Sequence, residues 1–115
     1  MRHIEQQIQI ALVQFLRLQY PNLLFTISPG GLLTNARIGG KAKKLGYQKG
    51  VPDIIIFSPN SKYHGLFIEM KSAKGYPTPE QKFWISELNK RNYKAVICHS
   101  FNEAKNVIDD YFSEK

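Results

Sequence analysis

The sequence has little cysteine and no long hydrophobic run. Cys98 is the single cysteine among 115 residues, which excludes an intrachain disulfide and leaves a cysteine-based zinc site without partners. No apolar stretch approaches the ~18 residues that a membrane-spanning helix needs. Residues 1–14 do not resemble a secretory signal, because Gln9 interrupts their apolar run and Gln14 ends it. We therefore expect a reducing, cytoplasmic compartment (the host cytoplasm if a phage encodes the protein) and no membrane partner.

Acidic residues are missing from one long interval of this chain, whose net charge is +7. None occurs between Glu5 and Asp53. A cluster of cations falls in the second half of that interval: Arg37, Lys41, Lys43, Lys44 and Lys49. A basic segment of one sign predicts a polyanion partner, whereas the alternative is a solvated face that binds nothing. We favour nucleic-acid binding because no acid interrupts the run.

The hydrophobic content of 43% is enough for one folded domain, which we place over residues 1–115. Apolar residues at helical spacing predict a helix over residues 3–19, and short apolar runs predict strands at 23–27, 54–57, 66–71 and 95–98. The segment 35–45 predicts a short helix that the pair Gly39-Gly40 weakens, so we expect it to become ordered on DNA. A hairpin of residues 53–57 against 66–71 is expected.

Two helix starts are marked by capping residues. Thr78, Pro79 and Gln81 form a capping box with proline at the first helical position, and this helix should run to about Asn89. Its expected inward side chains are Phe83, Trp84 and Leu88. Ser100 and Glu103 mark the final helix, which extends through Phe112. The predicted order is α-β-(α)-β-β-α-β-α, an α/β fold with a central mixed sheet flanked by helices.

Three polar residues on the central hairpin predict chemistry. Glu69 and Lys71 are two apart on a strand and therefore project from the same face. Asp53 starts the preceding strand, sixteen residues before Glu69, so a hairpin would bring the two acids together. Two convergent carboxylates suit a hard cation such as Mg²⁺ or Mn²⁺, and a lysine beside them could stabilise an attacking hydroxide or a phosphate. The alternative is a solvated salt bridge at a strand edge.

These residues carry a resemblance to a known family. Gly50-Val51-Pro52-Asp53 followed by Glu69-Met70-Lys71 resembles the PD-(D/E)XK nuclease signature. The fuller pattern also includes Glu5 in the first helix and Gln81 followed by Trp84. This combination resembles the VRR-NUC branch, in particular its small stand-alone phage and bacterial members. The V-R-R tripeptide that gives the branch its name is absent from this chain.

The resemblance implies a restriction-endonuclease-like fold, Mg²⁺ or Mn²⁺ as cofactor, and structure-specific DNA cleavage. It implies that Asp53, Glu69 and the backbone carbonyl of Met70 bind the metal and that Lys71 is the catalytic lysine. It also implies that Glu5 and Gln81 complete the pocket. Without the resemblance, Glu5 would be a favourable charge at a helix N-terminus and Gln81 a capping residue.

Several functions remain open at this point. The leading one is a metal-dependent DNA endonuclease that resolves four-way (Holliday) junctions as a two-fold homodimer. The alternatives are a monomer that nicks flaps or splayed arms, a restriction-type enzyme on the same fold, and a nucleic-acid-binding module without catalysis. Two apolar groups could form a dimer interface or belong to the core. One comprises Phe25, Leu32 and Leu33, and the other is the pair Tyr111-Phe112.

Overall fold

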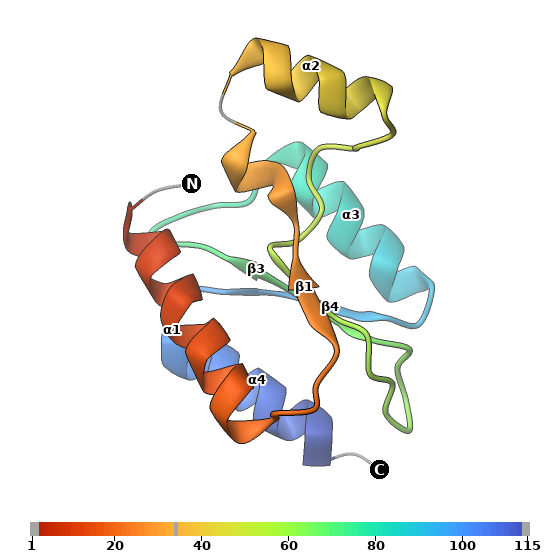
Figure 1. The fold of residues 1–115 in the computed structure, drawn as a ribbon. Coiled ribbons are helices and arrows are strands. Elements are labelled where there is room, and N and C mark those ends of the chain that lie inside the picture. The colour runs from red at the N-terminus through yellow and green to blue at the C-terminus, as the bar shows by residue number, and fades with distance from the viewer. Residues whose placement is uncertain (1–2, 34, 114–115) are drawn as a thin grey trace.

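A computed structural model describes residues 3–33 and 35–113 (Figure 1). Its helices are α1 (His3–Gln19), the 3-10 turn η1 (Pro29–Leu32), α2 (Ala36–Lys44), α3 (Pro79–Lys90) and α4 (Phe101–Ser113). Its strands are β1 (Phe25–Ile27), β2 (Ile54–Ile56), β3 (Leu66–Met70) and β4 (Lys94–Cys98). The predicted order of elements is confirmed. Three strands are shorter than expected, since β1 begins two residues later and β2 and β3 each end one residue earlier.

The four strands form one mixed sheet in the order β1-β2-β3-β4. Strand β2 is antiparallel to both β1 and β3, whereas β3 and β4 are parallel. A parallel pair needs a crossover connection, and α3 supplies it. Helices α1 and α4 pack together on one face of the sheet, and α3 lies on the other (Figure 1).

The core lies between the sheet and the α1/α4 pair. The side chains of Ile68 and Met70 point into it and are fully buried. Tyr111 is 1% exposed, and its hydroxyl donates a hydrogen bond to the carbonyl of Ser58. Phe112 is partly buried and packs against the same core, so the C-terminal aromatic pair contributes mainly to the core.

The capping prediction for α3 is confirmed, but the prediction that Phe83 points inward is wrong. The Thr78 hydroxyl accepts from the Gln81 N–H, and the Gln81 side chain accepts from the Thr78 N–H. Leu88 is buried, whereas Phe83 is 61% exposed. Trp84 and Leu88 are four residues apart and face the body together, and Phe83 is turned about 100° from Trp84 around the helix.

Helix α2 projects from the rest of the molecule (Figure 1). None of its residues is buried. The Asn35 side chain accepts from the Ile38 N–H and caps its first turn. Gly46, at φ 112°, ends the helix and turns the chain back toward the sheet. Among the described helices, none is both long and apolar enough to cross a membrane.

Candidate active site

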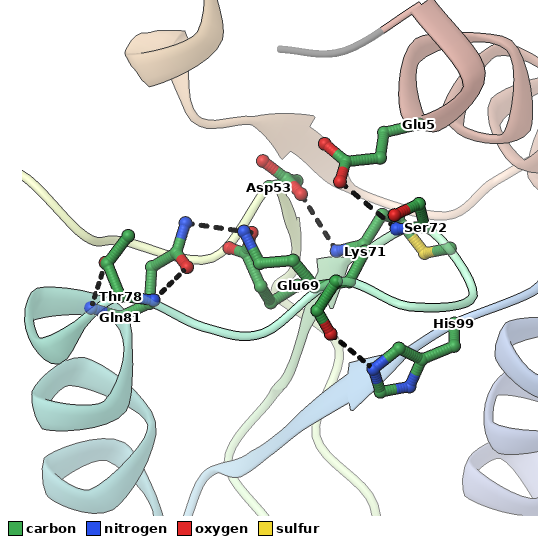
Figure 2. Close-up of polar contacts among 10 residues, drawn as sticks. Glu5, Asp53, Glu69, Lys71, Ser72, Thr78, Gln81 and His99 are labelled. Carbon is green, nitrogen blue, oxygen red and sulfur yellow. Dashed lines mark hydrogen bonds and ion pairs between the residues drawn. The ribbon is translucent and has the colours of Figure 1, made fainter.

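The hairpin register explains the spacing of the two acids. Ile54 pairs with Ile68, so the next residues outward, Asp53 and Glu69, lie opposite each other at the end of the hairpin (Figure 2). Asp53 Oδ2 accepts a hydrogen bond of 2.8 Å from the backbone N–H of Met70. The expected convergence of Asp53 with Glu69 is therefore confirmed.

Glu69 is a buried acid whose two carboxylate oxygens differ in their hydrogen-bond partners. It is 2% exposed, and its Oε2 lies 3.2 Å from Lys71 Nζ and 3.1 Å from Gln81 Nε2. Its Oε1 is buried and finds no hydrogen-bond donor among the described residues. The Lys71 and Glu69 side chains are only 12% and 3% exposed, so the alternative of a solvated strand-edge salt bridge is wrong.

The acid pair has a perturbed protonation equilibrium. Burial raises the pKa of Glu69 to about 8, and repulsion from Asp53 adds to this, while Lys71 opposes it. Burial also raises the pKa of Asp53, although the hydrogen bond from the Met70 N–H partly offsets this by lowering it. Near neutral pH the metal-free pair therefore holds a proton. Because the two carboxyls lie within hydrogen-bonding reach, that proton is held between Asp53 and Glu69.

Glu5 and Gln81 each lie in the first turn of a helix and also line the candidate site. Glu5 lies in the first turn of α1, yet it is 8% exposed, and its Oε1 accepts from the Ser72 N–H at 3.1 Å. Gln81 uses its carbonyl to cap α3 and its amide to hold Glu69 (Figure 2). These contacts join α1, β3 and α3 at one point.

The turn before Asp53 is fixed against α3. The Trp84 indole N–H donates to the Lys49 carbonyl at 3.1 Å. Gly50 has φ 107°, and a Cβ there would lie 2.6 Å from the backbone carbon of Glu80. Only glycine suits both the backbone angle and the close approach. The sequence suggested Trp84 only as a core residue. Hydrophobic spacing does not show which acceptor an indole N–H will bind, so the bond to Lys49 could not be predicted.

The side chains predicted to carry out catalysis line one cavity, which has a volume of about 220 Å³. Its walls include Glu5, Asp53, Glu69, Lys71 and Gln81. Lys49 also lines it, but the other predicted cations, Arg37, Lys41, Lys43 and Lys44, lie on α2 outside it. Tyr47 lines the cavity too, and the sequence carried no signal for it.

Comparison with known proteins decides the family. The family model described as "VRR-NUC domain" matches residues 5–102. The chain belongs to the VRR-NUC domain family. A solved structure described as a "VRR_NUC domain protein" is similar to it, with 28% sequence identity and a TM-score of 0.82, over 96% of this chain and 88% of that one. Comparison with curated proteins found no match. VRR-NUC is a nuclease-type family, which supports a DNA nuclease, and the expected fold class is confirmed.

The donors in this VRR-NUC site fit a hard cation. No three His, Cys, Asp or Glu side chains in residues 3–33 and 35–113 are grouped to hold a metal. Mg²⁺ does not need such a group, because it commonly binds through one or two carboxylates and keeps several waters. Asp53 and Glu69, two adjacent carboxylates that line one cavity, have that chemistry.

Proposed function

We propose that this protein is a divalent-metal-dependent, structure-specific DNA endonuclease that hydrolyses phosphodiester bonds. The observation that carries the proposal is the acid pair of half-buried Asp53 and buried Glu69, which shares one cavity with Lys71. Placing a buried carboxylate beside a half-buried one is unfavourable unless a cation or a proton compensates them. A catalytic metal site gives that arrangement a purpose.

Each residue would have a distinct part in the reaction. Asp53, Glu69 and the Met70 backbone carbonyl would hold Mg²⁺ or Mn²⁺, which when bound acidifies a water and polarises a phosphoryl oxygen. Lys71, held by Glu69, is placed to donate to the phosphate or to orient the attacking water. Gln81 keeps the Glu69 carboxylate in its orientation, and Glu5 fixes the backbone just after Lys71.

A nucleic-acid-binding module without catalysis is the competing function. The cations of α2 serve a binder and a nuclease equally well. The acid pair separates the two functions, because buried carboxylates at the binding surface would repel phosphate in a protein that only binds. A restriction-type enzyme or a flap or splayed-arm nuclease would share this site and differ in the DNA that it accepts.

We further propose that the enzyme is a homodimer that resolves four-way junctions. One cavity makes one nick, whereas resolving a junction needs two nicks related by a two-fold axis, which a C₂ dimer supplies. Of the two apolar groups considered for the interface, Tyr111 and Phe112 belong to the core. In the other group, Phe25 also packs against the core, whereas Leu32 remains available because it is 65% exposed and lies beside the sheet-edge strand β1.

The test is incubation of the protein with duplex, flap, splayed-arm and four-way DNA in Mg²⁺, Mn²⁺ or EDTA. We expect cutting that needs the metal and prefers a branched substrate. Binding without cutting in either metal would support the binding module. Sedimentation with and without a four-way junction tests the dimer, and a monomer in both conditions would rule out the coordinated resolvase while leaving the nuclease proposal intact.

A further inference from the structure

A groove runs from the candidate active site along α2. It has a volume of about 870 Å³ and shares Gly30, Tyr47 and Lys49 with the cavity that holds the acids. Gly39, Gly40 and Lys43 form its α2 wall. Because the two spaces share lining residues, an extended ligand could pass from one into the other. We call this space the α2 groove.

Neither the backbone conformation nor the packing of α2 requires the two glycines in that wall. Gly39 and Gly40 are inside α2, where glycine is among the least favourable residues. A Cβ at either position would meet nothing within 4 Å, and neither residue has the positive φ found at Gly46 and Gly50. Neither backbone angle nor packing requires them, so the open backbone that they leave faces the groove.

The groove has the charge for a phosphate backbone. Lys43 and Lys49 stand in its walls, and further cations lie elsewhere on α2, against one acid in the described lining, Glu80. Tyr47 lies at the junction with the active site, where its hydroxyl is 2.5 Å from the place of a Cβ on Gly30. The adjoining cavity is lined by Asp53, Glu69 and Lys71, the residues of the candidate active site.

We propose that the α2 groove holds one unpaired strand of DNA next to the scissile phosphate. Its sugar–phosphate backbone lies against Gly39 and Gly40, and a base lies against Tyr47. A volume of 870 Å³ is within the range of about 300–1,000 Å³ of pockets that enclose small ligands, so the groove has room for a few nucleotides of one strand. The inference rests on the proposed nuclease function. It favours a flap or splayed-arm substrate, which carries an unpaired strand, over a four-way junction, whose arms are fully paired.

A size series at Gly40 tests the groove. Gly40→Ala and Gly40→Val are compared with the wild type for anisotropy-measured binding in Ca²⁺ to a splayed-arm DNA and to a fully paired duplex, and for cleavage in Mg²⁺. We expect the splayed-arm Kd to rise with side-chain size, by roughly tenfold or about 1.4 kcal/mol for valine. Duplex affinity should change by less than about twofold, well below that tenfold step.

Control variants separate a steric effect from helix stability. Alanine favours a helix more than valine does, so a response that tracked helix order would be larger for Gly40→Ala than for Gly40→Val and would overturn the proposal. Ile38→Ala raises helix propensity at an exposed site outside the groove and should leave both affinities unchanged. Within the groove, Lys43→Gln should weaken splayed-arm binding and Glu80→Gln should strengthen it.

The outcomes distinguish the groove from the nuclease. If the wild type cuts DNA and both Gly40 variants bind and cut splayed-arm DNA equally well, the groove proposal fails and the nuclease proposal stands. If the wild type binds but never cuts, the nuclease proposal fails, and the size series still decides the groove by affinity. If the wild type binds neither DNA, both proposals fail.

Discussion

The acid pair and α2 differ in what holds their charges in place. Glu69 is 2% exposed at the end of the central hairpin and is fixed by Lys71 and Gln81. Helix α2 carries its cations with no buried residue at all. Charges that take part in chemistry must be oriented and partly desolvated, which requires the surrounding core. Charges that attract a polyanion act over about a Debye length and need only exposure.

This difference predicts opposite tolerance to substitution. A change at the acid pair alters groups that several elements hold, so it should affect catalysis or stability strongly. A change of charge on α2 should alter DNA affinity and leave the folded state almost as it was. The experiments below test whether the two regions separate in this way.

Removing one carboxylate charge should have the largest effect. Asp53→Asn and Glu69→Gln keep the shape of the side chain and remove the proposed metal ligand charge. We expect cleavage to fall on the order of 10³-fold, with folding retained and DNA binding unchanged or tighter, because a charge that repels phosphate is removed. Single-turnover cleavage with matched anisotropy measures both effects. Robust Mg²⁺-dependent cutting by either variant would contradict the assignment.

Removing three cations from α2 should weaken DNA binding without unfolding the protein. With Lys41, Lys43 and Lys44 all changed to glutamine, each DNA phosphate that is no longer neutralised lowers the slope of log K against log salt by about 0.9, or about 2.7 in total. Thermal stability should stay within about 0.5 kcal/mol of the wild type, because these side chains are exposed. A slope that does not change would place the DNA on another surface.

The metal-free protein should become less stable as the pH rises. The folded-state pKa of Glu69 is about 8, above its ordinary value of 4.5, so its contribution is fully present below pH 4.5 and is lost as the pH approaches 8. The loss should be on the order of a few kcal/mol. Denaturant unfolding in EDTA at pH 5 and pH 9 measures it. Glu69→Gln should flatten this dependence, and an equally steep curve for that variant would point to other groups.

The site was predictable where it followed periodicity and register. The alternation of a strand places Glu69 and Lys71 on one face, and a hairpin places Asp53 beside them, so both followed from spacing. Tyr47 and the indole bond of Trp84 did not follow, because each depends on where a loop packs against a distant helix. Phe83 was misplaced for a related reason: an apolar side chain in a helix does not by itself show which face is buried.

The same glycine substitution should have opposite effects in the two regions. Gly50→Ala forces a side chain into φ 107° and within 2.6 Å of the Glu80 backbone, so it should destabilise the protein by about 1–3 kcal/mol and displace Asp53 with its turn. Gly40→Ala meets open space and should stabilise α2 by up to about 1 kcal/mol. Urea unfolding would measure the first effect, and amide hydrogen exchange within α2 the second. Because α2 buries nothing, its gain can appear locally without raising the global midpoint, whereas the loss at Gly50 spreads to α3 and the hairpin. Equal and small effects at both positions would mean that the turn before Asp53 adjusts as freely as α2 does. That result would contradict the contrast between an active site fixed by the surrounding elements and an exposed helix.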